Sequence, residues 1–188
     1  MNVYDFDKTI FYPDSSYCFV RYCLRHYPRA VLTALSESAK NGLLWAAKKI
    51  DTKDLKESVF SFLPRIDNIE QVVTEFWNEY RSHIAAWYRD QQRSEDLIIS
   101  ASPEFLLRPV AEELGVALIA TRMDPHTGRI IGNNCHDSEK ICRFLKEYPG
   151  QQPETFYSDS LSDSPMAWFS REAWLVKDGK ELVPWPNK

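Results

Sequence analysis

The sequence has no apolar run long enough to cross a membrane. Its most apolar stretch, NGLLWAA at residues 41–47, is followed at once by Lys48 and Lys49, whereas a membrane-spanning helix needs about 20 consecutive apolar residues. The N-terminus also lacks a signal-peptide pattern, because it becomes acidic within a few residues. We therefore predict a cytoplasmic protein that has no membrane partner.

The chain has no excess of positive charge either. It contains 23 Lys and Arg against 27 Asp and Glu, which gives a net charge of -4, and both signs are mixed along the chain. A general nucleic-acid-binding protein would show a basic stripe, so none is expected as a partner. With 44% hydrophobic and 27% charged residues, the composition is that of a soluble globular protein.

None of the four cysteines belongs to a CxxC pair. Cys18, Cys23, Cys135 and Cys142 do not form the dense framework of a small disulfide-rich domain, so we expect reduced thiols. His136 lies next to Cys135 and raises the question of zinc, but the spacing fits no structural zinc pattern.

What the sequence does contain is a change in the predicted secondary structure along the chain. A short strand is predicted at residues 2–6, a helical region from about 15 to 90, and strands alternating with helices from residue 96 onward. Such alternation implies a parallel α/β sheet. The opening strand must join that sheet, because alone it could bury nothing.

Local signals predict the individual elements. In the helical region the apolar side chains recur at helical spacing. The predicted apolar faces are Val31, Leu32, Leu35, Ala39, Leu43, Ala46 and Ile50 after Pro28; Leu55, Val59 and Phe62 between an Asp51 or Thr52 cap and Pro64; and Ile69, Val73, Phe76, Tyr80, Ile84 and Trp87 on one stripe. Later elements are strands at 96–100, 116–120 and 154–158, a hairpin at 122–132, helices at 136–148 and 164–169, and a β pair at 173–185. For the helix after residue 100, Ser102 is predicted as the N-cap, Pro103 as the first residue and Gly115 as the stop.

Polar residues fall where the predicted strands end. Asp5 and Asp7 lie on the same side of an extended segment, Ser100 ends a second strand, and Asp159 and Asp163 follow a third. In open α/β sheets, ligands bind beyond the carboxyl ends of the strands. Each residue alone could merely shape a turn or bind local backbone groups, but together they predict a site.

Lys140 supports this interpretation. It is predicted in the first turn of a helix, where a cation opposes the helix dipole at a cost of about 0.3–1 kcal/mol. An anion held in front of that helix would offset the cost.

Taken in order, these motifs resemble the haloacid dehalogenase superfamily of phosphohydrolases. The match comprises DFDKT (residues 5–9), Ser100, Lys140 and DSLSD (residues 159–163). It is most similar to the phosphoserine-phosphatase-like branch, in which a helical cap is inserted between the first and second motifs. The predicted fold is therefore α/β, a Rossmann-like three-layer sandwich with a parallel sheet. Residues 1–13 and 92–188 would form its catalytic core, and residues 14–91 an inserted helical cap domain.

The resemblance implies a role for each motif residue. Asp5 would be the nucleophile that forms an aspartyl-phosphate, and Asp7 the general acid and base, with its pKa raised by its charged neighbour Asp5. Ser100 and Lys140 would bind the transferring phosphoryl group. The residues implied at a Mg²⁺ site are Asp5, the main-chain carbonyl of Asp7, Asp159 and Asp163, the last through water or by orienting Lys140. Thr9 would brace the loop.

Two features refine this expectation. Superfamily members that remove halide or cleave phosphonates lack an acid at the position of Asp7, so its presence here favours phosphate esters. Ser158 and Ala101 stand where the family commonly has glycine; both are small, and we expect altered loop geometry rather than lost activity.

The resulting hypothesis is a Mg²⁺-dependent phosphatase that hydrolyses a small phosphorylated metabolite. Two alternatives remain open: a phosphotransferase with the same covalent intermediate, and a catalytically silent metal-binding interaction domain. Neither the substrate nor the oligomeric state can be read from the sequence. Tyr17 and Tyr22 could help to cage a quaternary ammonium group, although core packing explains such aromatics more simply.

Overall fold

A six-stranded sheet organises the molecule. The computed structural model describes residues 1–36 and 51–186. The strand order is β3-β2-β1-β4-β5-β6, and every neighbouring pair is parallel except β5 and β6, which form an antiparallel hairpin at one edge. The predicted α/β class with a parallel sheet is confirmed.

The helices and strands follow the predicted order of a short strand, a helical region, and then strands alternating with helices. The strands are β1 (Val3–Tyr4), β2 (Leu97–Pro103), β3 (Ala117–Thr121), β4 (Thr155–Ser158), β5 (Glu172–Lys177) and β6 (Glu181–Pro184). The α-helices are α1 (Ser15–His26), α3 (Thr52–Val59), α4 (Ile69–Tyr80), α5 (Ala86–Gln91), α6 (Glu104–Leu114), α7 (Ser138–Glu147) and α8 (Ser164–Phe169), and residues 28–36 are also helical. Short 3-10 turns are η1 (Leu63–Arg65), η2 (Arg81–His83) and η3 (Leu161–Asp163).

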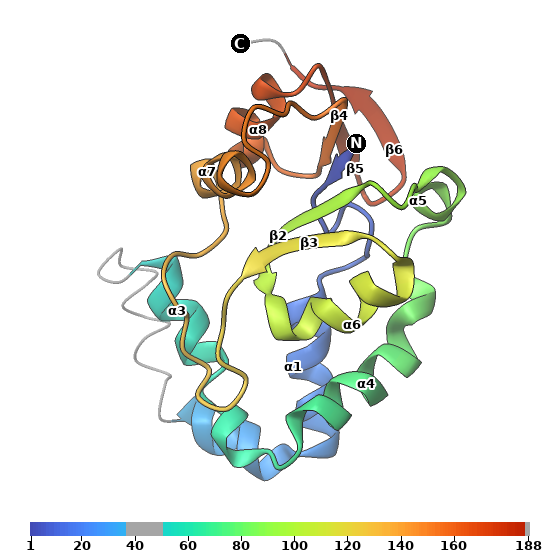
Figure 1. Cartoon of the computed structure of the whole chain (residues 1–188). Helices are drawn as coiled ribbons and strands as arrows, with labels where there is room; N and C mark the ends of the chain where they lie inside the picture. Colours follow the sequence, from blue (N-terminus) through green and yellow to red (C-terminus); the bar gives the residue numbers. More distant parts are fainter. Residues whose placement is uncertain (37–50, 187–188) are drawn as a thin grey trace.

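Alternating residues of the central strands divide the interior into two cores. Consecutive strand residues point to opposite faces of a sheet. One row of paired residues, in the core with α7 and α8, is Val3, Leu97 and Phe156. The next row, in the core with α1, α4 and α6, is Tyr4, Ile98 and Tyr157. The sheet is therefore the middle of three layers, with α7 and α8 on one side and α6 on the other (Figure 1).

Of the helical region between β1 and β2, α1, α3 and α4 lie on the same side of the sheet as α6 (Figure 1). The Trp77 indole of α4 donates a hydrogen bond to the carbonyl of Leu106 in α6 at 2.6 Å. On the same face of the sheet, the Tyr4 ring stacks on Tyr157 at 4.7 Å and meets Tyr88 of α5 edge-on at 4.8 Å. Because aromatics from both regions share one core, the helical region is held against the sheet by apolar burial.

Three local predictions need correction. The stripe from Ile69 to Trp87 is not one helix, since α4 ends at Tyr80 and η2 separates it from α5. The helix beginning at Thr52 ends at Val59 rather than before Pro64, and of the two predicted caps, Asp51 and Thr52, its N-cap is Asp51. Ser102 is not an N-cap, because β2 continues to Pro103 and α6 begins at Glu104.

The remaining predictions either fall on residues outside the described ranges or are not tested by the structure. The apolar positions Ala39, Leu43, Ala46 and Ile50 lie outside the described residues. The division into a core (residues 1–13 and 92–188) and a cap (residues 14–91) stays a prediction. None of the helices that the structure describes is both long and apolar enough to cross a membrane.

Candidate active site

Asp5 lies where β1 ends, in the middle of the sheet. Its N–H donates to the carbonyl of Tyr157 at 2.8 Å, which continues the pairing of β1 with β4 by one residue. Asp5 is buried, with 7% of the residue exposed. Because β1 lies between β2 and β4, Asp5 is flanked by these two neighbouring strands.

Lys140 of α7 bridges two buried carboxylates. Its ammonium donates to Asp5 Oδ1 at 2.5 Å and to Asp163 Oδ2 at 2.7 Å, and the lysine is 2% exposed. The cation predicted to need an anion in front of its helix thus has two carboxylates in direct contact. A buried charge of this kind is stable only when it is paired and hydrogen-bonded.

The pKa values show how burial and pairing compete at these groups. Burial by itself would lower the pKa of Lys140, but the charges of Asp5 and Asp163 outweigh it and raise that pKa above the usual value. For Asp5 burial prevails: it raises the pKa of the carboxyl despite the attraction of Lys140. The site holds Asp5 in an environment poor in water, where further positive charge would stabilise its ionised form.

Two hydroxyl groups tie the loops after β1 and β4 together. The Thr9 hydroxyl donates to Asp5 Oδ2 at 3.2 Å and accepts from the N–H of Asp159 at 3.0 Å. The Ser158 hydroxyl donates to Asp163 Oδ2 at 2.7 Å. Thr9 therefore braces the loop in the sense predicted, and Ser158, which replaces the family's usual glycine, helps to hold the carboxylate that binds Lys140.

Asp7 accepts hydrogen bonds at both carboxylate oxygens. The N–H of Ser15, the first residue of α1, donates to Oδ1 at 2.6 Å, and the Ser102 hydroxyl donates to Oδ2 at 2.5 Å. Burial, and next the charge of Asp14, raise the pKa of Asp7 to about 7. The predicted direction is right, but the neighbouring carboxylate that contributes to it is Asp14, whereas Asp5 was expected.

Ser100 and Ser102 lie at the end of β2 near this carboxylate. Ser100 is 1% exposed, and its hydroxyl accepts from the N–H of Ser102 at 3.0 Å. The Ser102 hydroxyl also meets that of Ser16 at 2.9 Å. Sequence reasoning missed Ser102 because the pattern Ser-Pro before an apolar run is typical of a helix N-cap, and no local signal pointed to Asp7.

The donor set near Asp5 suits magnesium. Burial, and next the charge of Asp5, raise the pKa of Asp159 to about 6, so a dication near both carboxylates would relieve their repulsion. Mg²⁺ in proteins usually takes one or two carboxylates and completes its shell with phosphate and water. Among residues 1–36 and 51–186, no group of three or more His, Cys, Asp or Glu side chains could hold a metal, but a site of two carboxylates and a main-chain carbonyl needs none.

Lys56 is a second residue that the sequence analysis missed. It projects from α3, and its ammonium donates to the carbonyl of Ala101 at 2.7 Å and to Asn134 Oδ1 at 2.9 Å. Ala101 directly follows Ser100, so a cation from the helical region reaches the end of β2. Burial lowers the pKa of Lys56 to about 8.

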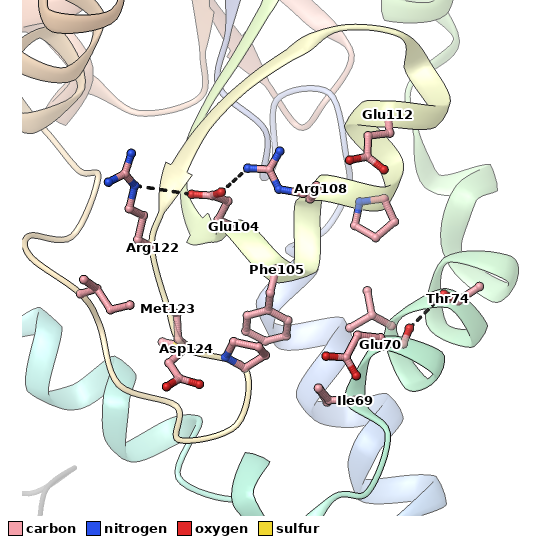
Figure 2. Close-up of a pocket in the computed structure, with 14 residues that line it drawn as sticks. Ile69, Glu70, Thr74, Glu104, Phe105, Arg108, Glu112, Arg122, Met123 and Asp124 are labelled. Carbon is pink, nitrogen blue, oxygen red and sulfur yellow. Dashed lines mark hydrogen bonds and ion pairs between the residues drawn. The ribbon is translucent and has the colours of Figure 1, made fainter.

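A cavity of about 610 Å³ lies elsewhere, between α4, α6 and the 122–132 hairpin (Figure 2). Phe105 lies at its centre, and on its rim Glu104 forms ion pairs with Arg108 and Arg122 (Figure 2). None of the predicted site residues lines this cavity, so the candidate active site rests on the strand ends.

Comparison with known proteins gives the family of the chain. The family model of haloacid dehalogenase-like hydrolases matches residues 3–167. The chain belongs to this family of hydrolases, as the motifs predicted.

Similar proteins cover nearly the whole chain. The sequence is 25% identical over 206 residues to a histidinol-phosphatase of Neisseria meningitidis serogroup C, covering 96% of this chain and 91% of the relative. Among solved structures, a protein of unknown function from Bordetella pertussis has a TM-score of 0.76 at 22% identity, with coverage of 92% of this chain and 87% of that one. A phosphoserine phosphohydrolase-like protein from Francisella tularensis has a TM-score of 0.56 at 16% identity, with 92% and 86% covered. These structures share the fold.

Proposed function

We propose that the protein is a Mg²⁺-dependent phosphatase that hydrolyses a small phosphomonoester through an aspartyl-phosphate on Asp5. The observation that carries this proposal is the fixed position of the Asp5 carboxylate at the end of β1. There it contacts Lys140 and Thr9 and lies close enough to Asp159 to raise its pKa. The family is one of hydrolases, and a relative named as a phosphatase covers almost the whole chain.

The first half of the reaction follows from Asp5 and Asp7. An Asp5 oxygen attacks phosphorus and forms a new P–O bond while the bond from phosphorus to the ester oxygen breaks. The departing oxygen takes a proton from Asp7, whose pKa of about 7 leaves it protonated for part of the time near neutrality. An ionised Asp5 needs no base to activate it.

The second half regenerates the enzyme. A water molecule gives a proton to Asp7 and attacks phosphorus, and the bond between phosphorus and the Asp5 oxygen breaks to release inorganic phosphate. Hydrogen bonds from Ser15 and Ser102 keep the Asp7 carboxylate in one orientation through both proton transfers.

The remaining residues stabilise negative charge. Lys140 compensates charge on Asp5 and on the transferring phosphoryl group, and the Ser100 hydroxyl donates to that group. Asp5, the Asp7 carbonyl and Asp159 would hold Mg²⁺, with Asp163 supporting the site through Lys140. The ion would polarise the phosphoryl oxygens and reduce the repulsion between substrate and carboxylates.

The test is phosphate release from p-nitrophenyl phosphate, and from a panel that includes histidinol phosphate and phosphoserine, with and without Mg²⁺. Asp5→Asn should abolish turnover while the circular dichroism spectrum stays that of the wild type. The matched control Asp178→Asn changes an exposed carboxylate in the β5–β6 turn and should keep the wild-type rate.

Three outcomes would contradict the proposal. Wild-type rates in Asp5→Asn would exclude this nucleophile. Consumption of the ester without free phosphate would favour a phosphotransferase. Binding of Mg²⁺ with no turnover across the panel would favour a silent metal-binding domain.

A further inference from the structure

Lys56 connects α3 to the candidate active site. Three side chains on one face of α3 contact the loop that follows β3 or the end of β2. Lys53 donates to the carbonyl of Gly132 at 2.8 Å, and Glu57 accepts from the N–H of Ile130 at 2.9 Å. Between them, Lys56 is the one that reaches the main chain next to Ser100, through the Ala101 carbonyl.

Neither hydrogen-bond partner of Lys56 carries a negative charge. Both of its acceptors are neutral, and among the ion pairs of the described residues none includes Lys56. Lys140, by contrast, contacts two carboxylates. An ammonium that has lost part of its hydration and has no carboxylate in direct contact favours binding of an anion.

Lys56 is also held in place by its surroundings. Asn134 Oδ1, one of its acceptors, accepts a second hydrogen bond from the Thr121 hydroxyl at 2.9 Å. The ammonium has three donors, and two of them are used by Ala101 and Asn134. The third is free of any partner given by the described residues, so it could meet a bound ligand without breaking either contact.

The hydrogen bonds of Lys56 place it on one side of the site. Ala101, whose carbonyl accepts from Lys56, directly precedes Ser102, whose hydroxyl donates to Asp7. The charges of Asp7 and Asp14 partly oppose the lowering of the Lys56 pKa by burial. Asp14 caps α1, whose first N–H binds Asp7. Asp7 is the proposed acid for the departing oxygen, whereas Lys140 lies at Asp5, where phosphorus is attacked. Lys56 therefore lies toward the alcohol part of the substrate.

We propose that Lys56 determines specificity by binding an anionic group on the alcohol part of the phosphomonoester. The substrate class is then a phosphate ester whose alcohol carries a carboxylate or a second phosphate, and esters with a cationic alcohol are poor substrates. This inference rests on the proposed phosphatase activity and adds the substrate class to it.

The experiment compares esters of equal length that differ only at the far end. The probes are 2-phosphoglycolate, 2-hydroxyethyl phosphate and 2-aminoethyl phosphate, together with the corresponding three-carbon esters, each assayed for kcat/KM with Mg²⁺. In at least one set the wild type should prefer the carboxylate ester over the neutral one by about 10- to 100-fold, the range expected for a hydrogen bond to a charged group. The ammonium ester should be the poorest substrate of that set.

Substitutions assign the preference to Lys56. In Lys56→Met the ratio of kcat/KM for the carboxylate ester to that for the neutral ester should fall to about one, and Lys56→Arg should retain part of the ratio because it keeps the charge. The matched control is Lys53→Met, which removes a lysine one turn earlier that binds the carbonyl of Gly132. It should leave the ratio at the wild-type value.

The outcomes separate this inference from the proposed function. Turnover of p-nitrophenyl phosphate without any preference for the carboxylate ester would overturn the specificity role alone. An equal loss for all esters in Lys56→Met, with the ratio unchanged, would also overturn it, since a lysine that only braces α3 would have that effect. If no ester released phosphate, both proposals would fail. If Lys56→Met does not fold, Lys56→Arg, which keeps the charge but changes the geometry, still tests the assignment: a ratio unchanged from the wild type would count against Lys56.

Discussion

At the scale of single residues, the site depends on one buried cation. Lys140 is 2% exposed and contacts Asp5 and Asp163, which are themselves buried. Removing one member of such a group leaves an unpaired charge where water cannot reach it. The free energy lost in this way exceeds the net stabilisation that the intact group contributes.

We predict that Lys140→Met lowers the free energy of unfolding at pH 7 by about 3–5 kcal/mol. The buried Asp5 carboxyl, whose pKa burial already raises, takes up a proton more readily in the folded state than in the unfolded state once the cation is gone. The variant should therefore recover stability relative to the wild type as the pH falls from 7 to 5. Urea unfolding at both pH values measures the two differences. The surface control Lys180→Met should be neutral, and a Lys140→Met variant as stable as the wild type would mean that the pairing adds nothing.

At the scale of elements, the position of α3 depends on a close approach to the 122–132 hairpin. A Cβ at Gly128 would lie 2.5 Å from the main-chain oxygen of Phe60, just beyond the end of α3. Gly132, on the same loop, has open space around its missing Cβ. Both glycines have a positive φ, +71° and +83°, which other residues adopt at a cost.

Because Gly128 and Gly132 differ in the space around them, substitutions at the two positions can be compared. Gly132→Ala should cost about 1–2 kcal/mol of stability for its backbone conformation alone. Gly128→Ala should cost about 1–3 kcal/mol more, because the backbone of Phe60 must move. Urea unfolding tests the difference, and assays with the carboxylate ester should show that only Gly128→Ala displaces Lys56 and weakens its preference. Equal losses of stability in both variants would show that the close contact between Gly128 and Phe60 does not hold α3 in position.

At the scale of the whole molecule, two hydrophobic cores bring distant segments to one edge of the sheet. The row with Val3 packs against α7, which carries Lys140, and the row with Tyr4 packs against α4 and α6. Because β1 lies between β2 and β4, carboxylates from the two ends of the chain meet and repel one another. A divalent cation should therefore bind to the folded chain and stabilise it.

We predict that Mg²⁺ raises the melting temperature of the wild type. A ligand present at 100 times its Kd adds about 2.7 kcal/mol to the free energy of unfolding. Asp159→Asn should lose most of the shift, and Asp178→Asn should keep it. Differential scanning calorimetry in EDTA and in increasing Mg²⁺ measures the effect without reference to activity. A wild-type melting temperature that does not respond to millimolar Mg²⁺ would contradict the proposed metal site.

The sequence alone determined the fold class and the residues at the strand ends. Periods of two and 3.6 residues are local properties, and parallel strands present their carboxyl ends at a common edge, so Asp5, Ser100 and Asp159 could be assigned to one site from their positions in the chain. Predictions from local signals were wrong about where some elements end, as at Ser102, because the same residues can cap a helix or extend a strand.

Only the tertiary structure decided which side chains meet across the site. Ser102 binds Asp7 from 95 residues away, and Lys56 reaches Ala101 across 45 residues. No period or cap motif carries such contacts, since they arise when one layer packs on another. The likeness of the motifs thus predicted the hydrolase family, while the packing of α3 brought the ammonium of Lys56 to the end of β2.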